Sequence, residues 1–192
     1  PQSALYGNDA LSGVVAYESA SGGAREGFET FLEGGTNNTI NGSARYGASG
    51  NGWDAAVSAT VVSTNGEPNA RGGTRDIGRD SYTFSGKASG DVTENLTLRA
   101  VGRYVRTEGD FNNQSGGFVV DSPGLRFENE SLSGLMGARL DALGGDWTHD
   151  LSAQFTEANR QTINGTAITS DTESDRFKAS YITAYSFGGS NH

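Results

Sequence analysis

Apolar and polar residues alternate along much of this chain. In the segment 52–64, Trp53 and Val57 fall on one side of an extended backbone, and Asp54 and Ser58 fall on the other. The same alternation is clear in 82–90, 96–105, 147–155 and 177–187, and weaker in 25–34, 39–47 and 131–142. A period of two predicts β-strands with one apolar face and one polar face. The chain is therefore expected to be all-β, with eight strands and no helix.

The connections between these segments differ in length. The stretches 65–80, 108–128 and 161–175 read as long polar loops, whereas 91–95 and 143–146 read as tight turns and 35–38 is shorter than the pattern expects. Alternating long and short connections are typical of outer-membrane β-barrels. A soluble β-sandwich also has alternating strands, so periodicity leaves both folds open. The expected strands exceed the usual length of about five or six residues, which favours the barrel.

Aromatic residues lie near the ends of the expected strands, where a membrane barrel carries aromatic girdles. They are Trp53, Tyr82, Tyr104, Trp147 and Phe187. Core positions of a sandwich are the alternative interpretation of the same residues.

Composition narrows the class of protein. Only 34% of the 192 residues are hydrophobic and the net charge is -9, which argues against a nucleic-acid site because such sites need a basic surface. Cysteine is absent, which excludes disulfides and thiolate metal sites. No apolar run approaches the roughly 20 residues of a membrane-spanning helix, and the start of the chain does not read as a signal peptide.

The first nineteen residues carry a specific motif. They read PQSALYGNDALSGVVAYES, from Pro1 to Ser19. This segment resembles the end of the plug domain of TonB-dependent outer-membrane receptors, which has the form G-P-x-S-A-L-Y-G-S-x-A-x-G-G-V-I-N-I. It departs from that form at Asn8, Ser12 and Ala16. Gly7 and Gly13 allow backbone bends, and Val14 begins a β-forming stretch.

The resemblance implies a fold and a division of the chain. Residues 1–22 are expected to be the C-terminal end of a plug domain. Residues 23–192 are expected to be the N-terminal part of an antiparallel transmembrane β-barrel, about the first eight of twenty-two strands. The location implied is the bacterial outer membrane.

The resemblance also implies a function. Such a receptor imports a scarce nutrient complex of the siderophore, haem or cobalamin class by energy-coupled, gated transport. Its partners are the nutrient complex, outer-membrane lipid and the TonB complex, which binds a segment not in this chain, and no cofactor is implied. A passive outer-membrane barrel or adhesin is the alternative, and a soluble β-sandwich binding module is a third reading.

Candidate site residues lie in the expected long loops. Arg71, Arg75 and Arg79 form a cluster with Asp76 and Asp80 that could bind an anionic ligand, with a solvated loop as the plain alternative. Glu108, Asp110 and Asp121 in the next loop suggest calcium, although their spacing does not show a converging set of ligands.

Other charged side chains give no sign of catalysis. Arg99 and Arg103 are expected on the polar face of their strand, where they would pair with carboxylates or line a ligand path. His149 and His192 are far apart in the chain and match no catalytic or zinc-ligand spacing, so no enzyme is expected.

Overall fold

The computed structural model describes residues 21–187 and contains ten β-strands and one short 3-10 turn, η1 (Leu143–Gly145). The strands are β1 (Gly27–Gly34), β2 (Ile40–Gly50), β3 (Trp53–Thr64), β4 (Arg79–Thr93), β5 (Leu96–Asp110), β6 (Asn113–Ser115), β7 (Phe118–Val120), β8 (Leu125–Ala142), β9 (Trp147–Asn164) and β10 (Ala167–Tyr185). The all-β expectation is confirmed. Within the described residues, no helix is long and apolar enough to cross a membrane. The expected plug segment 1–22 lies almost wholly outside the described residues, so it stays a prediction.

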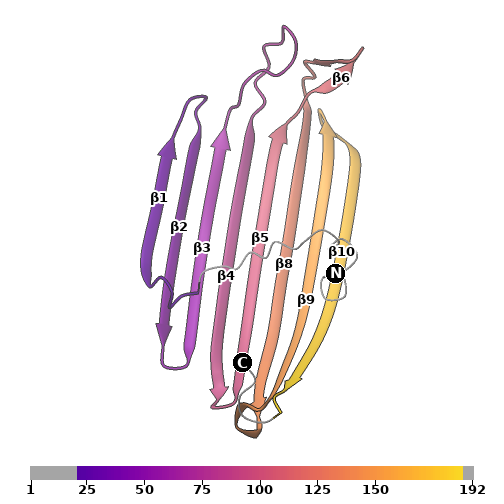
Figure 1. The fold of residues 1–192 in the computed structure, drawn as a ribbon. Helices are drawn as coiled ribbons and strands as arrows, with labels where there is room; N and C mark the ends of the chain where they lie inside the picture. The colour runs from indigo at the N-terminus through magenta and orange to yellow at the C-terminus, as the bar shows by residue number, and fades with distance from the viewer. Residues whose placement is uncertain (1–20, 188–192) are drawn as a thin grey trace.

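Eight strands form one antiparallel sheet in the order β1-β2-β3-β4-β5-β8-β9-β10 (Figure 1). Each strand pairs with its neighbour in the chain, except that the small hairpin β6–β7 is inserted between β5 and β8. The sheet is open, since β1 and β10 are not paired with each other. We call the end with connections 35–39, 65–78, 111–124 and 165–166 the loop end. The opposite end, with 51–52, 94–95 and 143–146, is the turn end.

The sheet has no hydrophobic core on either face. Ile163 is the only buried hydrophobic side chain among residues 21–187, while Met136 is 73% exposed and Phe177 is 74% exposed. The accessible surface is 13502 Å², whereas a compact monomer of this mass exposes about 8,700 Å². An isolated sheet in water would leave this apolar surface without a partner, so its stability requires another medium or another protein layer.

The prediction of one long loop is wrong. Residues 161–175 are not a long polar connection, because β9 continues to Asn164 and β10 begins at Ala167, leaving only residues 165–166 as a turn. Polar residues predominate on both faces of the sheet in this part, apart from Ile163 and Ile168, so no apolar alternation marks the strands. The Asn164-Gly165 pair was the available signal, since Asn-Gly is a strong hairpin signature and Gly165 has a φ of 63°.

The loop expected at 108–128 is shorter than predicted for a similar reason. Strand β5 extends to Asp110 and β8 begins at Leu125, so only 111–124 lies outside the main sheet, and it contains the β6–β7 hairpin. The connection at 65–78 agrees closely with the prediction.

Candidate functional site

The apolar face of the sheet carries an uncharged band. In the six main-sheet strands from β3 to β10 the band covers at least nine residues on each strand, namely 53–61, 82–90, 96–104, 132–140, 147–155 and 177–185. No apolar-face position within these ranges is Asp, Glu, Lys or Arg. A transmembrane β-strand needs about 9–11 residues to cross the hydrocarbon core of a bilayer.

The loop-end edge of the band is marked by an abrupt change to charge. Two residues beyond the band, the apolar face changes from Tyr82 to Asp80, from Tyr104 to Arg106, from Leu132 to Glu130, from Phe155 to Glu157 and from Phe177 to Asp175. Four of these five charged residues are acidic. The uncharged part of the apolar face therefore ends at this line on these five strands.

This edge crosses the sheet at a slant. Tyr82 lies opposite Arg106 and Leu132 lies opposite Glu157, so the edge moves by two residues at each of these two pairings. It does not move between Tyr104 and Leu132 or between β9 and β10. The edge also does not move between Val61 and Tyr82, so the total displacement is four residues over the five pairings from β3 to β10.

The turn-end edge has the same slant. Trp53 on β3 shares a row with Leu151 on β9, through Gly90, Leu98 and Ala138. Trp147 marks the edge on β9 and lies four residues from Leu151. An average displacement of roughly 0.8–1 residue per strand corresponds to a strand tilt of about 29–35° for a rise of about 3.3 Å and a strand spacing of about 4.8 Å. Transmembrane barrels have a tilt of roughly 35–45°.

Aromatic side chains with polar tips cluster at the turn-end edge of β9 and β10. The Trp147 indole N–H donates to the Thr183 hydroxyl at 2.9 Å, and the His149 ring lies 2.7 Å from the Tyr181 hydroxyl. The rings of Trp147 and His149 are 4.3 Å apart between centroids. These pairs satisfy the polar groups within the cluster, which suits the boundary between hydrocarbon and water.

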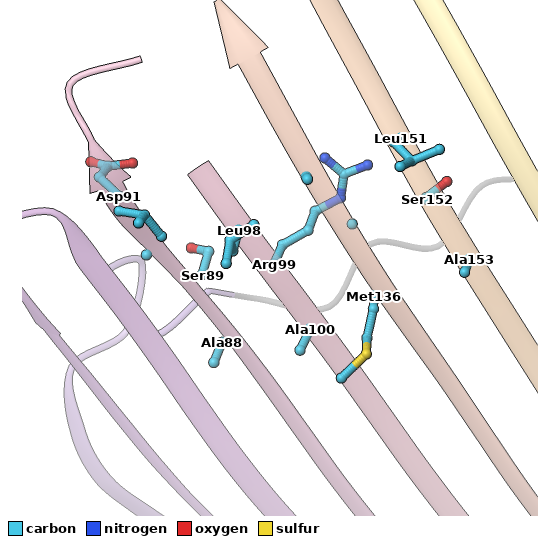
Figure 2. Close-up of a pocket in the computed structure, with 14 residues that line it drawn as sticks. Ala88, Ser89, Asp91, Leu98, Arg99, Ala100, Met136, Leu151, Ser152 and Ala153 are labelled. Carbon is cyan, nitrogen blue, oxygen red and sulfur yellow. The ribbon is translucent and has the colours of Figure 1, made fainter. Parts of the chain in front are cut away.

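A shallow groove of about 700 Å³ crosses β4, β5, β8 and β9 in their half nearest the turn end (Figure 2). Its apolar-face lining combines small side chains, including Ala88, Ala100 and Ala153, with the larger Val92, Leu98, Met136 and Leu151. The groove lies on the uncharged face near the turn end. It is part of the apolar surface and has no polar group on that face that could orient a ligand.

The opposite, polar face of the sheet carries charged residues within the same residue ranges. Within the nine-residue ranges, the polar face holds Asp54, Lys87, Arg99, Arg103, Arg139, Asp150 and Lys178. The contrast between the two faces is therefore maintained across the whole band. This confirms that Arg99 and Arg103 lie on the polar face.

Arg99 forms the strongest ion pair of this face. Its guanidinium donates two hydrogen bonds to the Asp150 carboxylate, at 2.7 and 2.6 Å. The side chain extends from β5 over β8 to reach β9, and a Cβ at Gly137 would lie 2.8 Å from the Arg99 Nε (Figure 2). Glycine at position 137 therefore leaves the path open for this bidentate pair.

Arg103 lies on the same strand and face but has no carboxylate within 4 Å among the described residues. We therefore expect Arg99→Ala to lower the free energy of unfolding by about 1–2 kcal/mol, since it leaves a half-buried carboxylate without its donors. Arg103→Ala should change it by less than about 0.5 kcal/mol. Urea titration of the two variants measures this, and equal effects would contradict the assigned role of Arg99.

Several other cations of the polar face have no ion pair within the part of the chain that the structure describes. They are Arg160 on β9 and Arg176 and Lys178 on β10, in addition to Arg103. The protein is acidic overall, yet the polar face from β5 to β10 keeps an excess of positive charge. An acidic partner or an anionic solute would complement it.

The chain reaches β1 from the polar face. Residues 21–26, which we call the strap, lie across β2 and β3. The Asp54 carboxylate accepts a hydrogen bond from the Gly23 N–H at 2.5 Å, and Arg45 donates to the carbonyls of Arg25 and Ser21 at 2.6 and 2.9 Å. The Ser49 hydroxyl also bonds the Glu26 carboxylate.

Two glycines make this close packing possible. A Cβ at Gly47 would lie 2.4 Å from the carbonyl oxygen of Arg25, and a Cβ at Gly22 would lie 2.0 and 2.4 Å from the carbonyl oxygens of Ala55 and Ala48. The strap is thus held against the polar face by both hydrogen bonds and backbone contact.

The three arginines proposed as ligand contacts occupy different environments. Arg71 stacks its guanidinium 4.9 Å from the centre of the Phe118 ring and is exposed. Arg75 is surrounded by acceptors from the second long loop. Arg79 begins β4, on the polar face, opposite Thr64 and Gly109. The structure does not bring them together as one site, and ligand binding by them stays a prediction.

The carboxylates suggested for calcium also separate. Asp110 pairs with Arg75 at 2.7 Å, and Asp121 accepts the backbone N–H groups of Thr74 and Arg75 at 2.9 and 3.3 Å. Glu108 lies on the apolar face of β5, beyond the band. Among residues 21–187 no group of three or more His, Cys, Asp or Glu side chains could hold a metal ion.

Sequence reasoning missed the strap and the contacts of Arg75. The strap contains Ser21-Gly22-Gly23, which signals a loop but not the surface on which it lies. Arg75 stands in a mixed-charge stretch with no periodic pattern, so its partners in 110–125 could not be identified. The loop-end edge was readable on β4, β5, β8, β9 and β10, because each of these strands places an aromatic residue or leucine two residues before a charge.

No protein-family model and no curated protein matches this sequence. The structure therefore defines only the fold class of this protein, which is an all-β chain with an open, eight-stranded antiparallel sheet.

Proposed function

We propose that this sheet is part of the wall of a bacterial outer-membrane β-barrel, with its apolar face toward lipid and its polar face toward the lumen. The observation that carries the proposal is the uncharged band of at least nine residues per strand with an average stagger of about one residue per strand. Nine residues at a tilt of about 35° span about 22 Å, close to the apolar band of about 25 Å in such barrels.

We further propose that the barrel belongs to a TonB-dependent receptor, which imports a scarce nutrient complex of the siderophore, haem or cobalamin class. The resemblance of residues 1–19 to the end of a plug supports this. The strap supports it independently, because it leads the chain toward β1 along the polar face, which is the inside of a barrel in this orientation. A plug inside the lumen needs such a connection.

Energy coupling would explain why a barrel of this kind contains a plug. A lumen wide enough for a large nutrient complex would leak small solutes, so a plug must close it at rest. Opening the plug against its contacts requires work, which TonB would deliver from the inner membrane. The unpaired cations on the polar face would complement carboxylates of a plug or an anionic nutrient.

The test is made with the full-length protein in its native cell. We expect it in the outer-membrane fraction, with faster gel migration when unheated than when heated, and we expect it to cross-link to TonB. Recovery of the intact protein in the soluble fraction would support a β-sandwich and overturn the proposal. Outer-membrane location without any TonB cross-link would instead indicate a passive barrel or an adhesin.

A further inference from the structure

The two long loops at the loop end, 65–78 and 111–124, make extensive contact with each other. Arg75 of the first loop donates to the carbonyl oxygen of Phe111 at 2.8 Å, to the Asn112 side chain at 3.0 Å and to the carbonyl oxygen of Leu125 at 2.9 Å. It also pairs with Asp110 at 2.7 Å. Its side chain is only 17% exposed. One guanidinium thus joins both ends of the second loop to the first.

Asp121 makes the reciprocal connection. Its carboxylate, in the second loop, accepts the backbone N–H groups of Thr74 and Arg75 in the first. A Cβ at Gly73 would lie 2.3 Å from the Asp121 Oδ1, so glycine allows the first loop to approach this carboxylate closely. Each loop therefore places one charged side chain against the backbone of the other.

Further bonds connect the outer parts of the loops. The Asn112 side chain donates to the Asn69 side chain at 2.9 Å, and the Arg71 N–H donates to the Val119 carbonyl at 3.2 Å. The Arg71 guanidinium stacks on Phe118, which is 53% exposed. The connections thus continue from the strand ends to the β6–β7 hairpin.

We propose that loops 65–78 and 111–124 form one pre-assembled surface unit, and that Arg75 is its positioning residue and not a cargo contact. The planar guanidinium suits this role, because its fork of donors reaches four acceptors at once. All of its partners in the unit are already protein atoms. Arg71 and Phe118 lie on the exposed surface of the unit, where they can contact a ligand.

This proposal deepens the proposed function. It rests on that function in one respect only, namely that the transported ligand meets the protein at the loop end. A pre-assembled unit would bind with less loss of conformational entropy than two independent loops. Whether the loops are one unit is a separate question, which can be answered without any cargo.

The test is amide hydrogen exchange of the intact protein in detergent, followed by mass spectrometry of peptides. We expect Arg75→Ala, a change in the first loop, to speed exchange in peptides covering 111–124 at least tenfold. Asp121→Ala, a change in the second loop, should do the same to 65–78. Arg75→Lys should not restore protection, since an ammonium cannot reach all four acceptors. Arg79→Ala is the matched control and should leave both loops unchanged.

Exchange in β4, β5 and β8 is measured in the same samples and should stay as in the parent. If Arg75→Ala speeds exchange only within 65–78, the loops are independent and the proposal is wrong. If the strands of a variant also exchange faster, Arg75 has a general structural role and the positioning role is overturned. A water-soluble protein with these same exchange results would contradict the membrane proposal but not the loop unit.

Discussion

Replacing Met136 with arginine is expected to lower the free energy of unfolding of the protein in lipid by about 2–4 kcal/mol. Met136 is the middle residue of the range 132–140 on β8 and faces away from the polar side of the sheet. In a bilayer this position lies near the midplane, where a charge is most costly. Urea titration of the protein in lipid vesicles measures the effect.

Leu135→Arg is the matched control, because Leu135 is the preceding residue on the same strand and lies on the polar face. It should cost less than about 1 kcal/mol, the ordinary scale of a substitution beside water. Met136 is already 73% exposed, so in a water-soluble protein its replacement would be the milder of the two. Equal costs, or a larger cost at Leu135, would refute the assignment of the apolar face to lipid.

The second large effect is expected at the strap. Gly22→Val should release residues 21–26 from β2 and β3, because the added Cβ would lie 2.0 Å from a backbone oxygen that cannot move without disturbing the sheet. The hydrogen bonds of Asp54 and Arg45 to the strap would then be lost. We expect trypsin to cleave after Arg25 at least tenfold faster than in the parent protein.

Gly102→Ala provides the control for this experiment, since a Cβ there would meet nothing within 4 Å. Its cleavage rate should equal that of the parent. An unchanged rate in Gly22→Val would mean that the strap is not held by this contact. The argument that the chain reaches β1 along the polar face would then lose its main support.

The sequence predicts the strands of this fold where apolar and polar residues alternate, and it fails where they do not. Residues 53–61 and 96–104 could be identified because side chains on one face must be apolar where they meet a non-aqueous surface. The strand ends at 161–175 could not, because polar residues predominate on both faces there and pairing depends on backbone register. Register is a property of two segments, and the apolar periodicity of one segment does not reveal it.

The loop contacts were beyond sequence reasoning for a different reason. Arg75 binds groups at 110–112 and at 125, which are brought near it only by the pairing of β4, β5 and β8. The sequence shows its charge but not its partners. The interpretation of Arg71, Arg75 and Arg79 as equivalent ligand contacts therefore treated three side chains alike although their surroundings differ.

The average stagger of the band determines how the wall of the proposed barrel can change in size. With about one residue of displacement per strand, each strand adds about 6 Å to the circumference. The tilt depends on the displacement per strand and not on the number of strands. A hairpin could therefore be gained or lost during evolution, changing the width of the pore while every remaining strand keeps its angle and its depth in the bilayer.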